Sequence, residues 1–261
     1  MKNSGQSWPD FGQLENQELL QLAKLTTRHI CFLRPDIIKF LVEDNERHRE
    51  EWCIQLKERG VEPTLYLWEN SSCAFPGVRR HAGSGEIAIH KGQKKAEERP
   101  RNALALDDNS YPKQIWSFIF QGKKFGNKGP PGYSLTHLAD HKDYKNRASD
   151  EFVSADLEKL KSTSFGLYTS PTNTVYLPNG LMRPTDFSNQ LRNLVLRKAQ
   201  ALYQNFCKLW PSHYSLKEES TSEWSLDSFD WREPVGTRDH IQSFLDYRKI
   251  KMEKLFESKK D

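Results

Sequence analysis

The sequence predicts an α+β fold with a mainly helical N-terminal region, two short strands that lead into a long helix, and a C-terminal helix. Between residues 16 and 60, apolar side chains recur at the three- and four-residue spacing of amphipathic helices. Two apolar runs, 133–138 and 174–177, have the length of strands. A pattern of helical period follows at 187–206. Strands and helices thus occupy separate stretches, which favours α+β.

The N-terminal region, 1–110, begins with two predicted helices. The second starts at Pro35, which suits a first helical turn, and ends at Gly60, which suits a C-cap. Apolar runs at 65–68 and 87–89 then predict strands, joined by a basic, glycine-containing turn. The polar stretch that follows, to residue 109, predicts a surface loop.

The middle region, 111–215, holds the predicted hairpin and helix. Residues 111–125 fit either a strand or a short buried helix. A glycine and proline cluster then turns the chain into the strand at 133–138, and Asn173 leads into the second strand. The helix that follows has Thr185 as its predicted N-cap.

The last region, 216–261, is predicted to be a helical extension. Its helix, 237–256, opens at Asp239 and His240, where an aspartate simply favours the helix dipole. We therefore interpret this Asp-His pair as structural. The aromatic cluster Trp224, Phe229 and Trp231 before the helix suggests that the extension docks on the body of the protein.

Composition narrows the class of protein. With 261 residues the chain can bury a core, and 11% aromatic residues offset a low hydrophobic fraction of 36%. The four cysteines form no Cys-x-x-Cys pair, which argues against a zinc knuckle and a disulfide framework. No apolar run suits a signal peptide or a bilayer span, so we expect a cytoplasmic protein without membrane contact. Phosphate-binding glycine loops and Gly-x-Ser-x-Gly are also absent.

A second Asp-His pair, Asp140-His141, lies at the end of a predicted strand among lysines and arginines. A carboxylate can bind a hard divalent cation while a neighbouring imidazole takes a proton from water, and phosphodiester hydrolysis requires both. His137 is an alternative imidazole. In an extended strand His137 and His141 share one face and Asp140 the other, so the strand must bend near Ala139 for the pair to converge.

From Gly132 to near Tyr203, this pattern resembles the HNH, or ββα-metal, nucleases, in which a β-hairpin and a helix hold a divalent cation. The resemblance implies that Asp140 binds the metal, that His141 is the general base, and that Asn173 orients the imidazole through its backbone or amide. It also implies Mg²⁺ as the ion, with Mn²⁺ as a substitute. The family pattern has a further ligand after the central Asn, where this chain has Leu181, Met182 and Arg183.

Asp186 and Asn189 are the candidates for that missing ligand. A hard cation prefers carboxylate oxygen, which favours Asp186. An aspartate in a first helical turn also favours the helix dipole with no metal bound.

We expect from this resemblance a metal-dependent DNA endonuclease of the restriction or phage-defence type. The alternative is a non-catalytic subunit with a degenerate HNH fold that binds nucleic acid or a partner. A net charge of +4 only permits an anionic ligand, but basic residues cluster around the motif. The predicted phosphate contacts are Lys142, Lys145, Arg147, Arg192 and Arg197, and Arg79 and Arg80 are predicted to contact bases. A palindromic target would suit a homodimer, and a regulatory subunit is a further expected partner.

Overall fold

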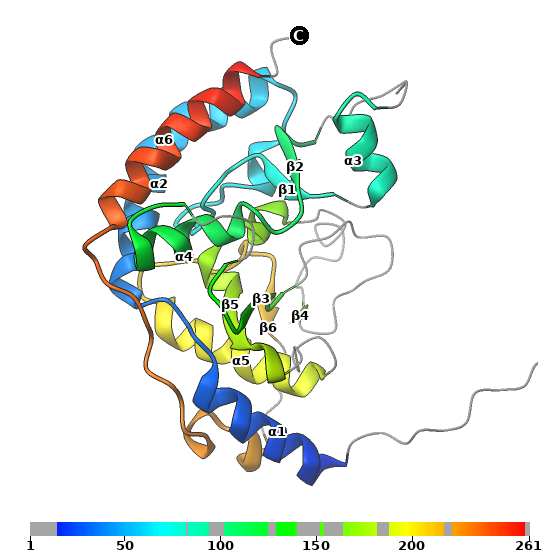
Figure 1. Ribbon diagram of the computed structural model, residues 1–261, viewed down its shortest axis with the longest axis vertical. Coiled ribbons are helices and arrows are strands. Elements are labelled where there is room, and N and C mark those ends of the chain that lie inside the picture. The colour runs from blue at the N-terminus through cyan, green and yellow to red at the C-terminus, as the bar shows by residue number, and fades with distance from the viewer. Residues whose placement is uncertain are drawn as a thin grey trace, which may run out of the picture.

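The computed structural model describes residues 15–81, 83–93, 102–124, 129–139, 152–153, 164–181, 188–216 and 221–258. Within these ranges it has six α-helices and three two-stranded sheets, which confirms the α+β class (Figure 1). The helices are α1 (Asn16–His29), α2 (Pro35–Glu58), α3 (Ser84–His90), α4 (Pro112–Gln121), α5 (Asn189–Tyr203) and α6 (Ile241–Glu257). The strands are β1 (Val78–Arg80), β2 (Ala105–Asp107), β3 (Tyr133–His137), β4 (Phe152–Val153), β5 (Thr174–Pro178) and β6 (Ser215–Leu216).

The two N-terminal helices match their sequence signals. Pro35 is the first residue of α2. The N–H that proline lacks would have no partner within the helix at this position, so no hydrogen bond is lost. At the other end Gly60 has φ +68°, and the N–H of Val61 donates to the carbonyl of Leu56 over 2.9 Å. This left-handed glycine closes α2 as predicted, because it lets the chain turn back onto the last carbonyl groups.

Three short segments differ from the predictions. Residues 65–68 form no strand, because Pro63–Leu65 is a 3₁₀ helix. The run at 87–89 lies inside α3, and β2 lies in the stretch predicted as a loop and pairs in parallel with β1. The open choice at 111–125 is settled in favour of a helix, α4. A three-residue apolar alternation fits a helix turn as well as a strand, so the periodicity could not separate them.

Strands β3 and β5 lie at the two runs that were predicted to be strands, and we refer to this pair as the hairpin. They pair antiparallel, with Leu135 opposite Tyr176 and His137 opposite Thr174. Helix α5 follows in the chain, and its N-cap is Ser188, whose hydroxyl accepts from the N–H of Leu191 over 3.2 Å. The predicted cap Thr185 lies outside the described residues.

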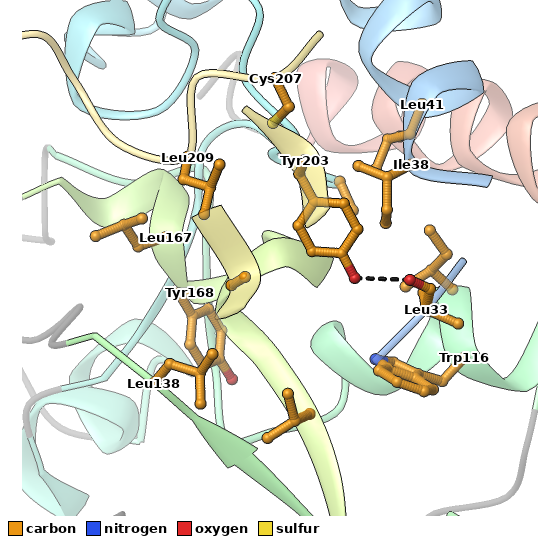
Figure 2. Close-up of a cluster of buried hydrophobic side chains, with 14 of the residues drawn as sticks. Leu33, Ile38, Leu41, Trp116, Leu138, Leu167, Tyr168, Tyr203, Cys207 and Leu209 are labelled. Carbon is orange, nitrogen blue, oxygen red and sulfur yellow. Dashed lines mark hydrogen bonds between the residues drawn. The ribbon is translucent and has the colours of Figure 1, made fainter. Parts of the chain in front are cut away.

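One hydrophobic core cluster draws residues from all three predicted regions. The backbone of Cys31 bridges to Tyr176, and that of Leu33 to Val235. Figure 2 shows the Tyr203 hydroxyl of α5 directed at the Leu33 carbonyl, to which it donates over 2.6 Å. Helix α6 confirms the predicted C-terminal helix and packs against α2 and α4. The extension therefore docks on the body, as predicted.

A buried ion pair joins α6 to α2. Arg248 is 0% exposed, bonds to the Asp44 carboxylate and donates to Asn45 Oδ1 over 2.7 Å. Its guanidinium lies 4.9 Å from the centre of the Trp52 ring. Burial lowers the pKa of Arg248, and the Asp44 carboxylate opposes that effect. The charge is thus kept in the core by one carboxylate, one amide and one aromatic face.

None of the helices in the described ranges has the length and apolar character of a membrane span.

Candidate functional site

The Asn173 side chain ties the start of β5 to the chain just beyond β3. Its Oδ1 accepts from the N–H of Ala139 over 2.7 Å, and its Nδ2 donates to the carbonyl groups of Ala139 (3.2 Å) and Leu167 (3.0 Å). The residue is 3% exposed, and its own carbonyl accepts from the N–H of Leu138 over 2.9 Å. A buried amide with this many partners is held in one orientation.

This contact shapes the backbone at the end of β3. The hydrogen bond from the N–H of Leu138 to the carbonyl of Asn173 extends the pairing with β5 by one residue past the end of β3. At the next residue, Ala139, the N–H donates to the side chain of Asn173 instead of to a backbone carbonyl of the opposite strand. The chain bends at 138–139, where a bend is required if Asp140 and His141 are to converge. Asp140 and His141 come next in the chain and lie outside the described residues. Asn173 therefore acts on the backbone that leads to the Asp-His pair.

His137 is fixed by Tyr168. Its Nε2 lies 2.9 Å from the Tyr168 carbonyl oxygen, and the two rings stack with centroids 5.4 Å apart and planes 14° apart. A carbonyl only accepts hydrogen bonds, so Nε2 carries the proton of the neutral ring and Nδ1 carries the lone pair. The contacts with Tyr168 also pack the end of β3. Both imidazoles, His137 and His141, therefore stay candidates.

Asp107 holds the Tyr168 ring in turn. Asp107 Oδ2 accepts from the Tyr168 hydroxyl (2.7 Å) and from the N–H groups of Ser110 (2.8 Å) and Tyr111 (2.7 Å). Burial, and then the Asp107 carboxylate, raise the pKa of Tyr168 well above its ordinary value. Sequence reasoning missed Asp107 and Tyr168. The only signal for Asp107 is an aspartate that ends a short apolar run.

This chain of contacts predicts a measurable effect of Tyr168→Phe. The change removes the donor to Asp107 and the acceptor for the Asn109 N–H, which lies 2.6 Å from the hydroxyl. We expect a loss of about 1–3 kcal/mol in the free energy of unfolding, measured by urea denaturation, because buried polar groups lose their partner. The matched change Tyr247→Phe, in a half-buried tyrosine of α6, should have little effect. Equal stability of both variants would show that the Asp107 contact is not stabilising.

The predicted metal ligands are only partly described. Asp140 and Asp186 lie outside the described residues, and Asn189 is the first, exposed residue of α5. Among the residues that the structure places, no three His, Cys, Asp or Glu side chains gather as a metal-binding group. Burial raises the pKa of Cys73 and of Cys207 to about 12, so both thiols stay protonated and are poor metal ligands. The remaining candidates offer carboxylate and amide oxygens, a donor set that fits a hard cation such as Mg²⁺.

Arg79 is not placed to contact DNA. It is 3% exposed, its guanidinium pairs with Glu86 of α3 and donates to Asn102 Oδ1 over 3.1 Å, and it lies 5.2 Å from the Phe165 ring centre. A guanidinium enclosed in this way cannot reach a base edge. The prediction of base contacts by Arg79 is therefore corrected to a role in the core, where it joins β1 to α3.

Of the other predicted nucleic-acid contacts, those that the structure describes lie on two separate elements, β1 and α5. Arg80 is half-buried and pairs with Asp108 over 3.3 Å. On α5, Arg192 and Arg197 are half-buried, and Arg197 donates to the Trp224 carbonyl over 2.8 Å. Arg197 thus helps to dock the aromatic cluster that precedes α6. Lys142, Lys145 and Arg147 lie outside the described residues.

The described part of the site is therefore a β-hairpin whose far end is bent by Asn173, with His137 beside the bend and α5 following in the chain. The 3₁₀ helix that ends in Asn173 (Pro171–Asn173) packs against α5. Comparison of the chain with protein-family models, with curated proteins and with solved structures finds no match.

Proposed function

We propose that this protein is a metal-dependent endonuclease that hydrolyses phosphodiester bonds of DNA. The observation that carries the proposal is the Asn173 clamp, in which a buried amide bends the chain at Ala139, one residue before Asp140-His141. The order of strand, strand and helix around that bend supports it. The clamp explains why an asparagine is buried directly before β5, because its hydrogen bonds fix the backbone that leads to Asp140-His141.

In this proposal Asp140 holds one Mg²⁺ with Asp186 or Asn189 as a second oxygen ligand. The ion, when bound, polarises the scissile phosphate and stabilises the leaving oxygen. His141 takes the proton from the attacking water, with His137 as the alternative base. Asn173 fixes the backbone at Ala139, from which the Asp-His pair follows in the chain. Lys142, Lys145 and Arg147 contact the flanking phosphates, as does Arg192.

The test is cleavage of supercoiled plasmid DNA by the full chain in Mg²⁺ or Mn²⁺. We expect nicked or linear product that disappears with EDTA and falls by about 10²-fold or more in Asp140→Ala and in His141→Ala, the usual scale for losing a general base. His137→Ala, assayed beside them, decides which imidazole is the base. Time courses under each condition supply the rates.

The other Asp-His pair, Asp239-His240, provides a matched control. Asp239 is exposed and bonds to the Thr237 hydroxyl over 3.0 Å, just before α6. Asp239→Ala and His240→Ala should leave cleavage unchanged. Cleavage that survives both EDTA and the motif variants would contradict the proposal. DNA binding without cleavage under any condition would instead favour the binding subunit, a function that the Leu181-Met182-Arg183 departure also supports.

A further inference from the structure

An aromatic pocket lies at the opposite end of the hairpin from Asn173. Its volume is about 290 Å³, and it is enclosed by α4, the turn before β3, β5 and the segment that leads to Val235. The residues that give the pocket its character are Trp116, Phe120, Pro131, Tyr133, Tyr176 and Arg232. Pockets for drug-sized ligands begin near 300 Å³, so this one suits a small planar group.

The walls of the pocket are flat and apolar. Trp116 meets Tyr176 edge to face, with ring centroids 4.9 Å apart, and lies parallel to Phe120 at 6.3 Å. Phe120 is 50% exposed, although large apolar side chains are usually covered. Aromatic faces of this kind stack on heteroaromatic rings.

One charged group distinguishes the pocket from an ordinary packing defect. The Arg232 guanidinium lies 3.5 Å from the Tyr133 hydroxyl, and its backbone is anchored to the Thr27 carbonyl over 3.0 Å. It places a positive charge beside the aromatic walls.

The pocket and the candidate site share one face of the hairpin. Side chains alternate along a strand, so Tyr133, Leu135 and His137 point to the same side, as does Tyr176 opposite Leu135. The four steps along the strand from Tyr133 to His137 span roughly 13 Å. Stacked nucleotides advance about 3.4 Å each, so the pocket lies about four nucleotide steps from the bend.

We propose that this pocket holds one unstacked base of the DNA strand, a few nucleotides from the bond that is cut, with Arg232 on the adjoining phosphate. The inference rests on the proposed nuclease function and deepens it, because a base held here sets the register of the strand. The aromatic walls stack on the base, and the cation neutralises the backbone.

The test is binding of a fluorescent 12-nucleotide single-stranded DNA to the full chain, followed by anisotropy. His141→Ala in Mg²⁺ and wild type in EDTA both prevent cleavage during the measurement. A series of the same oligonucleotide carries one abasic residue at successive places. We expect one place at which the abasic residue weakens binding by about tenfold, the scale of one lost base stack, and neighbouring places with little effect.

Two variants connect that effect to the pocket. Arg232→Gln removes the cation beside the aromatic walls, so binding of the intact oligonucleotide should weaken about fivefold. Phe120→Ala should weaken it about tenfold and remove the sensitivity to the abasic residue. Ile54→Ala, which changes an equally exposed apolar side chain of α2 (51% exposed), is the matched control and should bind as wild type.

The outcomes separate this inference from the proposed function. If cleavage and binding persist and no abasic place weakens binding, or if Phe120→Ala and Arg232→Gln both bind as wild type, the base pocket is overturned and the nuclease proposal is not. Absence of both binding and cleavage overturns both. Mononucleotides that bind as tightly as the oligonucleotide, and quench tryptophan fluorescence in wild type but not in Phe120→Ala, would make this a site for a free nucleotide and also overturn the inference.

Discussion

Asn173→Ala is expected to reduce DNA cleavage by roughly 10²-fold while the protein still folds, because a displacement of about 1 Å in a catalytic group has effects of that size. The change removes the bonds that hold Ala139 and frees the bend that precedes Asp140. Plasmid cleavage in Mg²⁺ measures the rate. Circular dichroism and urea unfolding measure the fold, where we expect a loss of about 1–3 kcal/mol from unsatisfied backbone groups.

Asn193 supplies the matched control for this experiment. It is also 3% exposed, lies on α5, and has a buried Oδ1 without a partner in the described part of the chain. Asn193→Ala should therefore keep both cleavage and stability. Asn173→Asp adds a finer test, since it keeps the acceptor for the Ala139 N–H and removes the donors to the two carbonyl groups. Wild-type cleavage by Asn173→Ala would contradict a role of the clamp in the site.

Asp44→Ala is expected to lower the free energy of unfolding by about 3–5 kcal/mol, because it leaves the fully buried Arg248 guanidinium without its carboxylate. Asn45 cannot replace that charge, and its amide is already used by the carbonyl groups of Ser71 (2.6 Å) and Cys73 (3.0 Å). A loss of this size is a large part of the 5–15 kcal/mol that typically stabilises a domain. Urea unfolding followed by tryptophan fluorescence gives the value.

A surface ion pair of the same type serves as the control. Arg34 and Asp36 lie 2.8 Å apart with side chains 49% and 31% exposed, so Asp36→Ala should cost about 1 kcal/mol or less. The double change Asp44→Leu with Arg248→Met should recover much of the stability, because two apolar side chains need no pairing in the core. If Asp44→Ala were no worse than Asp36→Ala, the pair would not hold α6 to α2.

The sequence correctly predicted those helices and strands around the candidate site whose residue pattern is long or is bounded by turn residues. Helices α1, α2 and α6 repeat their apolar residues over several turns, and strands β3 and β5 are bounded by clear turn residues. The closing glycine of α2 was predicted because only a residue without Cβ accepts a φ of +68° at low cost. Short runs such as 87–89 did not carry enough repeats to separate a helix from a strand.

The types of residue in the sequence could not show which charged side chains are buried. Arg79 and Arg80 are neighbours in a basic, glycine-containing segment, yet Arg79 lies in the core because β1 pairs with β2 and Glu86 of α3 comes within reach. Burial of a charge depends on partners that are distant in the sequence or on another element, and no local pattern records them.

The sequence by itself therefore determined the α+β class, the strands β3 and β5 and the longer helices α1, α2, α5 and α6, since these follow from local periodicity and turn chemistry. It also singled out Asn173 through a family resemblance. Only the tertiary structure decided that the Asn173 amide clamps Ala139, that Tyr168 and Asp107 support His137, and that aromatic residues of α4 and β5 form a pocket beside Arg232. Each of these depends on packing between segments 30 or more residues apart, as the 34 residues between Ala139 and Asn173 illustrate.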